Sequence, residues 1–189
     1  MTGAQGWIEA ARQGNAEAWE RLVLEHQQPI FRLAYLLLGD ADDAEDIAQE
    51  TFLRAYHALD RFDSARPLRP WLMRIATNLC RNRQRSLGRY LAALQKLLRS
   101  EPAPDSAVQQ AEQNLEADRL WKTVRRLRLE DQQVIYLRYF LDCSEAETAE
   151  ALGVAPGTVK SRSHRALGRL REVLKSESPQ PVQEHMDVF

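Results

Sequence analysis

Hydrophobic residues recur every three to four positions along most of the chain, which is the spacing of an α-helix rather than of a strand. Asn15 precedes the first such stretch and is a typical N-cap residue, so a helix is predicted over residues 16–38. Asp42 and Glu45 have the spacing of a capping box and predict a second helix over 42–59. No segment alternates convincingly between apolar and polar residues. The pattern therefore predicts an all-α fold.

Two interruptions divide the rest of the pattern. The segment 62–70 contains two prolines and predicts a loop, after which a helix is expected over 71–85. Residues 86–117 are expected to form a hinge. An amphipathic helix is considered over 87–98, but the Pro- and Ser-containing stretch 100–106 breaks any helix, and 89–117 is interpreted as a flexible linker. Further helices are predicted at 120–129, 132–140, 145–152 and from 157 onward, followed by a loose tail at 176–189. The chain is thus expected to form two small helical domains, residues 1–88 and 118–175.

The second predicted domain has the spacing of a helix-turn-helix. Ser144 and Glu147 form a capping-box pair, Gly153 permits a turn, and Val159 can anchor the second helix. With 100° between successive residues, the inward face of that helix is apolar and contains Val159, Ala166, Leu170 and Val173. The opposite face carries Lys160, Ser161, His164 and Arg165, with Arg162 nearer the boundary. Such a face can meet phosphates and base edges in a major groove.

The helix predicted over 71–85 also has two different faces. Its apolar face contains Leu72, Ile75, Ala76 and Leu79, and its opposite face contains Arg74, Asn78, Arg81 and Arg85, bordered by Trp71. Arginines beside an aromatic ring and an irregular loop suit an unstacked base better than an intact duplex. An alternative is that Trp71 packs in the core and Asn78 is a solvated polar residue.

The net charge of −1 hides an uneven distribution of charge. Residues 66–100 contain nine Lys and Arg and no acid, and residues 159–175 contain six Lys and Arg and one acid. Residues 1–65, in contrast, contain five Lys and Arg and twelve acids. The two basic blocks can neutralise phosphates, whereas the acidic segment would be repelled by them.

Several classes of protein are disfavoured by the sequence. No apolar run is long enough to span a membrane, and the N-terminus does not have the pattern of a secretory signal. Cys80 and Cys143 are the only cysteines, which disfavours a disulfide scaffold and fits a reducing cytoplasm. The four histidines are scattered and no cluster has metal-ligand or nucleophile spacing, so neither an enzyme nor a cofactor is expected.

Three segments resemble a known family. They are DAEDIAQETFLRAYHAL at 43–59, PWLMRIATNLCRNRQR at 70–85 and SEAETAEALGVAPGTVKSRSHRALGRLREVL at 144–174. In this order they resemble segments of RNA polymerase sigma factors of the extracytoplasmic-function (ECF) type. The resemblance implies a protein that binds core RNA polymerase and directs initiation at promoters with particular −10 and −35 elements. It also implies an anti-sigma factor as a further partner.

The resemblance also implies site residues. Contacts with core polymerase would come from Asp46, Gln49, Glu50 and Phe52. Residues 63–70 would form the specificity loop, and −10 DNA would be contacted by Arg66, Trp71, Arg74, Asn78, Arg81 and Arg85, with Asn78 lining the pocket for a flipped base. The −35 DNA would be contacted by Thr158, Lys160, Ser161, Arg162, His164 and Arg165, with Ser161 and His164 as base readers. A stand-alone helix-turn-helix regulator remains the alternative, although it would leave the segments 43–59 and 71–85 without a function.

Overall fold

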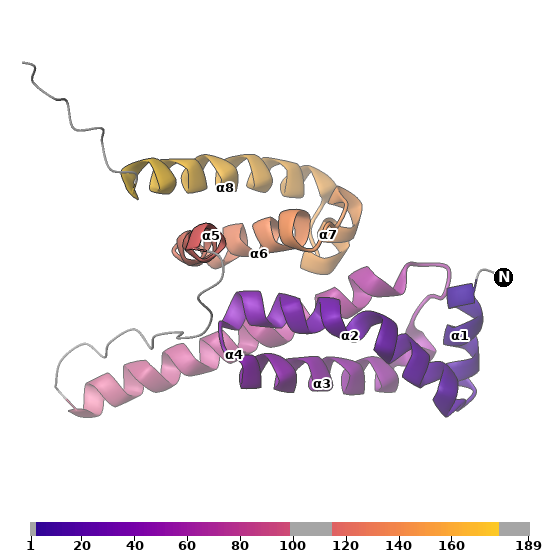
Figure 1. Ribbon diagram of the computed structural model, residues 1–189. Coiled ribbons are helices and arrows are strands. Elements are labelled where there is room, and N and C mark those ends of the chain that lie inside the picture. The colour runs from indigo at the N-terminus through magenta and orange to yellow at the C-terminus, as the bar shows by residue number, and fades with distance from the viewer. Residues whose placement is uncertain (1–2, 99–114, 178–189) are drawn as a thin grey trace, which may run out of the picture.

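The computed structural model describes residues 3–98 and 115–177, and within these ranges the chain is helical with no strand (Figure 1). The first domain contains α1 (Gly3–Arg12), α2 (Ala16–Leu38), α3 (Ala41–Ala58), the short 3₁₀ turn η1 (Leu59–Arg61) and α4 (Leu68–Leu98). The second contains α5 (Leu115–Arg125), α6 (Leu129–Ile135), the π-helical turn η2 (Tyr136–Phe140), α7 (Glu145–Leu152) and α8 (Pro156–Glu177). The predicted all-α class with two helical domains is confirmed.

The ends of α2 follow from local side-chain chemistry. Asn15 caps the helix as predicted, because its Oδ1 accepts from the Ala18 amide at 3.0 Å. Gly39 ends it with a left-handed φ of 78°, which a residue without Cβ adopts easily. Asp40 then caps α3, its side chain accepting from the Asp43 amide at 2.8 Å. The predicted start at Asp42 is wrong because the turn at Gly39 already leaves Asp40 extended and in position to cap.

Helix α4 is longer than predicted at both ends. The expected loop ends at Pro67 rather than at Pro70, because Pro70 stands in the first turn of a helix, where its missing N–H is not needed. The predicted end at Arg85 is also wrong: the helix over 71–85 and the one considered over 87–98 form a single helix, because α4 continues without a break to Leu98. The predicted flexible linker is wrong at both ends, because residues 89–98 belong to α4 and 115–117 to α5. Residues 99–114 of that linker lie outside the described residues, as does the predicted tail from residue 178 onward.

The first two helices of the second domain are displaced from their predicted positions. Instead of 120–129 and 132–140, α5 ends at Arg125 and α6 begins at Leu129. The buried Gln132 amide fixes this break by donating to the carbonyls of Arg125 and Leu127, at 2.8 Å each. Helix α1 was not predicted; its buried Ile8 and Ala11 close one end of the first domain.

The two domains pack against each other through α4 and α7, and one continuous hydrophobic core runs across the boundary. Figure 1 shows α7 directly beside the helices of the first domain. The Cys143 Sγ lies 3.4 Å from the Met73 Sδ in this contact. At the other end of the contact, the ring of Tyr35 stacks on that of Trp121 with centroids 5.8 Å apart. The relative position of the domains is therefore held by buried contacts as well as by surface ones.

Candidate nucleic-acid and protein interfaces

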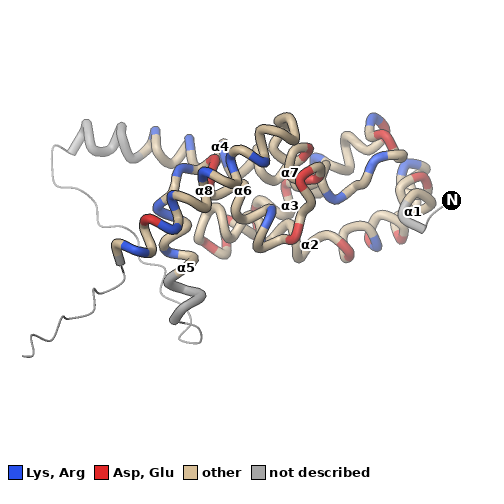
Figure 2. The backbone as a smooth tube through the Cα atoms, turned by 90° about the horizontal axis from the view of Figure 1, so that it is seen from above, with Lys and Arg blue, Asp and Glu red and all other residues tan. Residues whose placement is uncertain are grey.

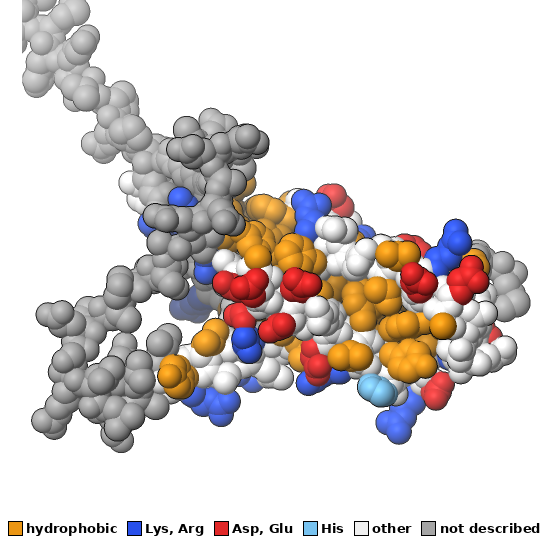
Figure 3. Space-filling model, turned by 60° about the horizontal axis from the view of Figure 1, so that its bottom comes forward, with side chains coloured by type: hydrophobic (Ala, Val, Ile, Leu, Met, Phe, Trp, Pro, Cys, Tyr) orange, Lys and Arg blue, Asp and Glu red, His pale blue; other side chains and the backbone are white. Residues whose placement is uncertain are grey.

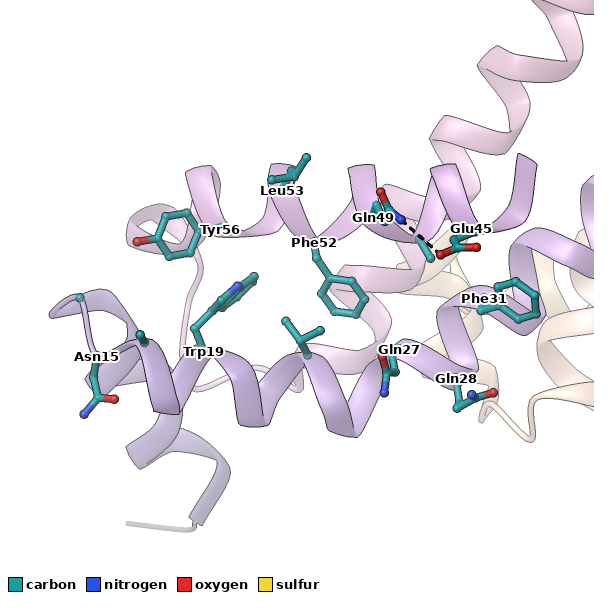
Figure 4. A pocket seen from close by; sticks show the side chains of 14 residues that line it. Asn15, Trp19, Gln27, Gln28, Phe31, Glu45, Gln49, Phe52, Leu53 and Tyr56 are labelled. Carbon is teal, nitrogen blue, oxygen red and sulfur yellow. Dashed lines mark hydrogen bonds between the residues drawn. The ribbon is translucent and has the colours of Figure 1, made fainter. Parts of the chain in front are cut away.

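A hollow of about 810 Å³ opens between α2 and α3 (Figure 4). The ring of Trp19 meets those of Phe52 and Tyr56 edge-on, with centroids 6.4 and 5.2 Å apart. Leu53 and Tyr56 remain 57% and 48% exposed. Figure 3 shows that hydrophobic side chains gather on this face, with acidic side chains around them. An exposed apolar groove with a charged rim is typical of a site that binds another protein.

The predicted polymerase-binding residues lie in this groove or next to it. Gln49 and Phe52 line the groove, and the Gln49 amide donates to Glu45 Oε1 at 3.4 Å. Asp46 and Glu50 lie on α3 outside the lining; Asp46 is exposed, and Glu50 accepts from Arg54 at 2.7 Å.

Most of the large apolar residues that line the groove were not among the predicted binding residues. The large apolar residues missed in this way are Trp19, Val23, Phe31, Leu53 and Tyr56. Their hydrophobicity and helical spacing are also those of core positions, so the pattern alone could not separate an exposed row from a buried one.

The basic face of α4 forms a second surface. Asn78 and Arg85 are exposed, and Arg85 borders a shallow hollow with Asn82 and Arg89. Trp71 is only partly buried, but its ring packs on that of Phe62, with centroids 4.6 Å apart. Its position is therefore closer to the core-packing alternative than to a freely exposed stacking platform.

Helix α7 and its neighbours occupy the part of this surface nearest the start of α4. Arg66 forms an ion pair with Glu150 of α7 at 2.7 Å, and Arg81 Nη2 donates to Gln133 Oε1 of α6 at 3.2 Å. The guanidinium of Arg74 lies against the turn after α7, where a Cβ on Gly153 would come within 3.5 Å of its Nη2. Three of the six predicted −10 residues thus contact the second domain, whereas Arg85 does not take part in these contacts.

The helix-turn-helix forms as predicted. The Ser144 hydroxyl accepts from the Glu147 amide at 3.1 Å, and a Glu147 carboxylate oxygen accepts from the Ser144 amide at 2.7 Å, which completes the capping box. The hydrogen bond from the Ser144 amide lowers the pKa of Glu147. Gly153 has a φ of 67°, and Val159 is fully buried as the anchor of α8.

The outward face of α8 forms the third surface, and its basic residues appear in Figure 2. Lys160, Ser161, His164 and Arg165 are all exposed, as the helical wheel predicted. Thr158 and Arg162 are half-buried at its edge; the Thr158 carbonyl accepts from the Ser161 hydroxyl at 3.1 Å, and Arg162 lies 3.9 Å from Glu130. One helical turn after Arg165, Arg169 forms an ion pair with the buried Asp131.

The two cysteines are both free and buried. Burial raises the pKa of the Cys80 thiol to about 12 and that of Cys143 to about 11, so both remain protonated near neutral pH. Within residues 3–98 and 115–177, no group of three His, Cys, Asp or Glu side chains is arranged to hold a metal ion. In the same ranges no helix has the length and apolar character needed to cross a membrane.

Comparison with known proteins identifies both domains. Residues 22–90 match the sequence profile of Sigma-70 region 2, and residues 117–170 match that of Sigma-70, region 4. The ECF RNA polymerase sigma factor SigW of Bacillus subtilis is 35% identical over 184 residues, covering 89% of this chain and 95% of SigW. The RNA polymerase sigma factor CnrH of Cupriavidus metallidurans is 32% identical over 179 residues, covering 89% and 92%.

Solved structures give the same result. CnrH in complex with the cytosolic domain of CnrY has a TM-score of 0.70 at 30% identity, and the match covers 93% of this chain and 99% of that one. The sigma factor RpoE in complex with the anti-sigma factor NepR from Bartonella quintana also has a TM-score of 0.70, at 26% identity, covering 86% and 100%. The two matched regions and these relatives show that the chain belongs to the ECF family of RNA polymerase sigma factors.

Proposed function

We propose that this sigma factor binds core RNA polymerase through the groove between α2 and α3, and promoter DNA through α4 and α8. It thereby directs transcription to promoters with its own −10 and −35 elements. The groove is the observation that carries this proposal, because a stand-alone helix-turn-helix regulator would have no use for an exposed apolar groove on its other domain.

The apolar groove and the acidic residues beside it would contribute in different ways to one contact with polymerase. Phe52, Leu53 and Tyr56 offer apolar surface, and its burial under a partner would favour binding. Asp46 and Glu50 lie at the edge of that area, where charges steer a basic partner more than they add to affinity.

The DNA contacts divide between the two domains. Lys160, Ser161, His164 and Arg165 lie on the exposed side of a helix anchored by Val159, which is how a recognition helix enters a major groove. We assign them to the −35 duplex, with Thr158 and Arg162 at the edge of the contact. The α4 residues Arg66, Trp71, Arg74, Asn78, Arg81 and Arg85 are assigned to the −10 element, where arginines hold the backbone of a locally unpaired strand.

The arrangement of the two domains has a consequence for the −10 contact. Because Arg66, Arg74 and Arg81 contact the second domain, a −10 strand bound at these residues competes with those contacts until the domains separate. The α8 face and the α2–α3 groove are exposed without such a change. We infer that core polymerase binds first and that separation follows.

Further partners and location follow from the family. The structural relatives were solved with CnrY and with the anti-sigma factor NepR, so we propose that an anti-sigma factor also binds this chain. We further propose that the protein acts in the cytoplasm, where its polymerase works, without a catalytic function or a cofactor of its own.

Two exposed leucines of α2 and α3 allow a matched test of the groove. Leu53→Ser alters the groove, whereas Leu24→Ser alters an equally exposed leucine, 59% against 57%, that does not line it. We expect Leu53→Ser to weaken binding to purified core polymerase about tenfold, as for an apolar residue near the centre of an interface, and to reduce run-off transcription in parallel. Leu24→Ser should bind and transcribe as the wild type does. Equal behaviour of the two variants would contradict the assignment of the groove.

A further inference from the structure

The side chain of Arg12 joins α1 to the segment that leads into the predicted specificity loop. Its Nε donates to the Leu59 carbonyl at 3.0 Å, its Nη2 donates to the Phe62 carbonyl, and its Nη1 pairs with Glu9 at 3.1 Å. All three guanidinium nitrogens are therefore used, and the side chain is only 19% exposed. Helix α1 lies before residue 22, where the match to Sigma-70 region 2 begins, so the family match assigns no role to this residue.

The two carbonyls occupy the point where the loop begins. Leu59 opens the turn η1, and Phe62 is the last buried residue before the exposed positions 63 and 65–67. After Phe62 the chain turns on Asp63, whose Oδ1 accepts from the Ala65 amide at 3.0 Å, and α4 then starts with the buried Leu68. The exposed part of the loop is thus short and fixed at both ends, and Arg12 holds its first end.

We propose that Arg12 is a positioning residue for promoter specificity: by holding the carbonyls of Leu59 and Phe62 together, it fixes the path of residues 63–67 and therefore the base that they accept in the −10 element. This inference rests on the proposed role of that loop in −10 recognition. The planar guanidinium suits the task, because its donors have a fixed angle and can satisfy two carbonyls at once. A lysine would keep the charge but present a single flexible ammonium, which cannot hold both carbonyls in a fixed geometry.

A purely structural role for Arg12 would have a different outcome. Loss of the two hydrogen bonds would then lower the stability of the first domain and reduce every function of the protein together. A positioning role instead alters the choice of base at −10 and leaves the −35 choice and core binding unchanged. Arg21 offers a matched control, because its guanidinium stacks over the Trp7 ring, 5.0 Å from its centroid, and so joins α1 to α2 without touching the loop.

The test measures run-off transcription by reconstituted holoenzyme on promoters that differ by single bases in either element. We expect Arg12→Ala and Arg12→Lys to reduce discrimination at −10 about fivefold, the lower limit for one well-placed base contact, with unchanged discrimination at −35. Arg21→Ala should retain the discrimination of the wild type at both elements. If Arg12→Ala does not fold, Arg12→Lys decides the question in a chain that still binds core polymerase with wild-type affinity.

Two results would overturn the inference. One is unchanged −10 discrimination in Arg12→Lys with normal core binding, and the other is an equal loss at −10 and −35. The loop assignment itself is checked separately by replacing residues 63–67 with a Gly-Ser segment of the same length. If that replacement leaves −10 discrimination intact, the proposed function of the loop fails; if it abolishes discrimination while the Arg12 variants do not alter it, only the role of Arg12 fails.

Discussion

The salt dependence of DNA binding gives a direct test of the α8 surface. Arg165 is exposed, and its Nε donates only weakly, at 3.3 Å, to the Ser161 carbonyl of its own helix. Its charge is therefore available for a phosphate. Arg169, one turn further along, is engaged with Asp131 and is not available in the same way. Arg165→Ala should consequently weaken binding to a −35 duplex by removing one phosphate contact.

The expected size follows from counterion release. Each neutralised phosphate contributes about 0.9 to the slope of log affinity against log salt, so the slope should become shallower by about 0.9. Between about 50 and 200 mM salt, the ratio of wild-type to variant affinity should therefore shrink about 3.5-fold. The measurement is a fluorescence-anisotropy titration of the full chain against a labelled duplex that has been selected from random sequences.

The matched control is Arg169→Ala. This change leaves the Asp131 carboxylate, which is only 7% exposed, without its partner, so the free energy of unfolding should fall. We expect a loss of only about 1–2 kcal/mol, because Arg169 is 40% exposed and water screens the pair. The salt slope should remain that of the wild type. Parallel salt plots for Arg165→Ala and the wild type, or the same change of slope in both variants, would refute the assignment of this face to phosphates.

Three further predictions concern the contact between the domains, the capping box and pH. Glu150→Gln removes the ion pair with Arg66, whose side chain is 55% exposed, and such a pair is worth about 0.5 kcal/mol. The population with separated domains should therefore about double, as measured by single-molecule FRET between dyes on α3 and α8. An unchanged population would contradict this. Ser144→Ala should lower the urea stability of the second domain by about 1 kcal/mol, and Ser144→Thr should restore it. Burial lowers the pKa of His26 from 6.5; Glu25 opposes this effect, and Arg69 adds a smaller lowering. As the pH falls below about 6.5, the unfolded chain is therefore protonated before the folded one. The free energy of unfolding should decrease until the pH reaches the pKa of His26 in the folded state. His26→Gln should flatten that part of the urea-stability curve, and an unchanged curve would show that other groups cause it.

The helix-turn-helix was predictable because its signals are local. Ser144 and Glu147 lie three residues apart, and Gly153 and Val159 act within their own turn and helix. The direction of each face of α4 and α8 was predictable for the same reason, since helical geometry fixes it once the apolar positions are known.

Features that depend on contacts distant in sequence were not predictable. Arg12 is an ordinary basic residue in the sequence, and its role appears only when Phe62, fifty residues away, is brought beside it. The groove residue Trp19 and the core residue Leu22 belong to the same helical pattern, and only tertiary packing leaves one lining a hollow and the other buried. The break before α6 likewise depends on where the Gln132 amide finds its carbonyls.

The α2–α3 groove, the α8 face and the basic face of α4 differ in exposure, and this difference favours an order in which their proposed partners bind. The groove and the α8 face are open, whereas the first part of α4 lies against the second domain. The −10 strand that we assign to this part of α4 would therefore compete with the contact made by α7. A ligand shifts such an equilibrium only by its difference in affinity for the two arrangements. Core polymerase can supply this difference in affinity if it binds the arrangement in which the two domains are apart. Once one domain is bound to its promoter element, the effective concentration of the second domain at the other element is raised. Under the proposed assignment of α4 to the −10 element, promoter opening would therefore depend on polymerase, because the α4 arginines contact the second domain until the two domains separate.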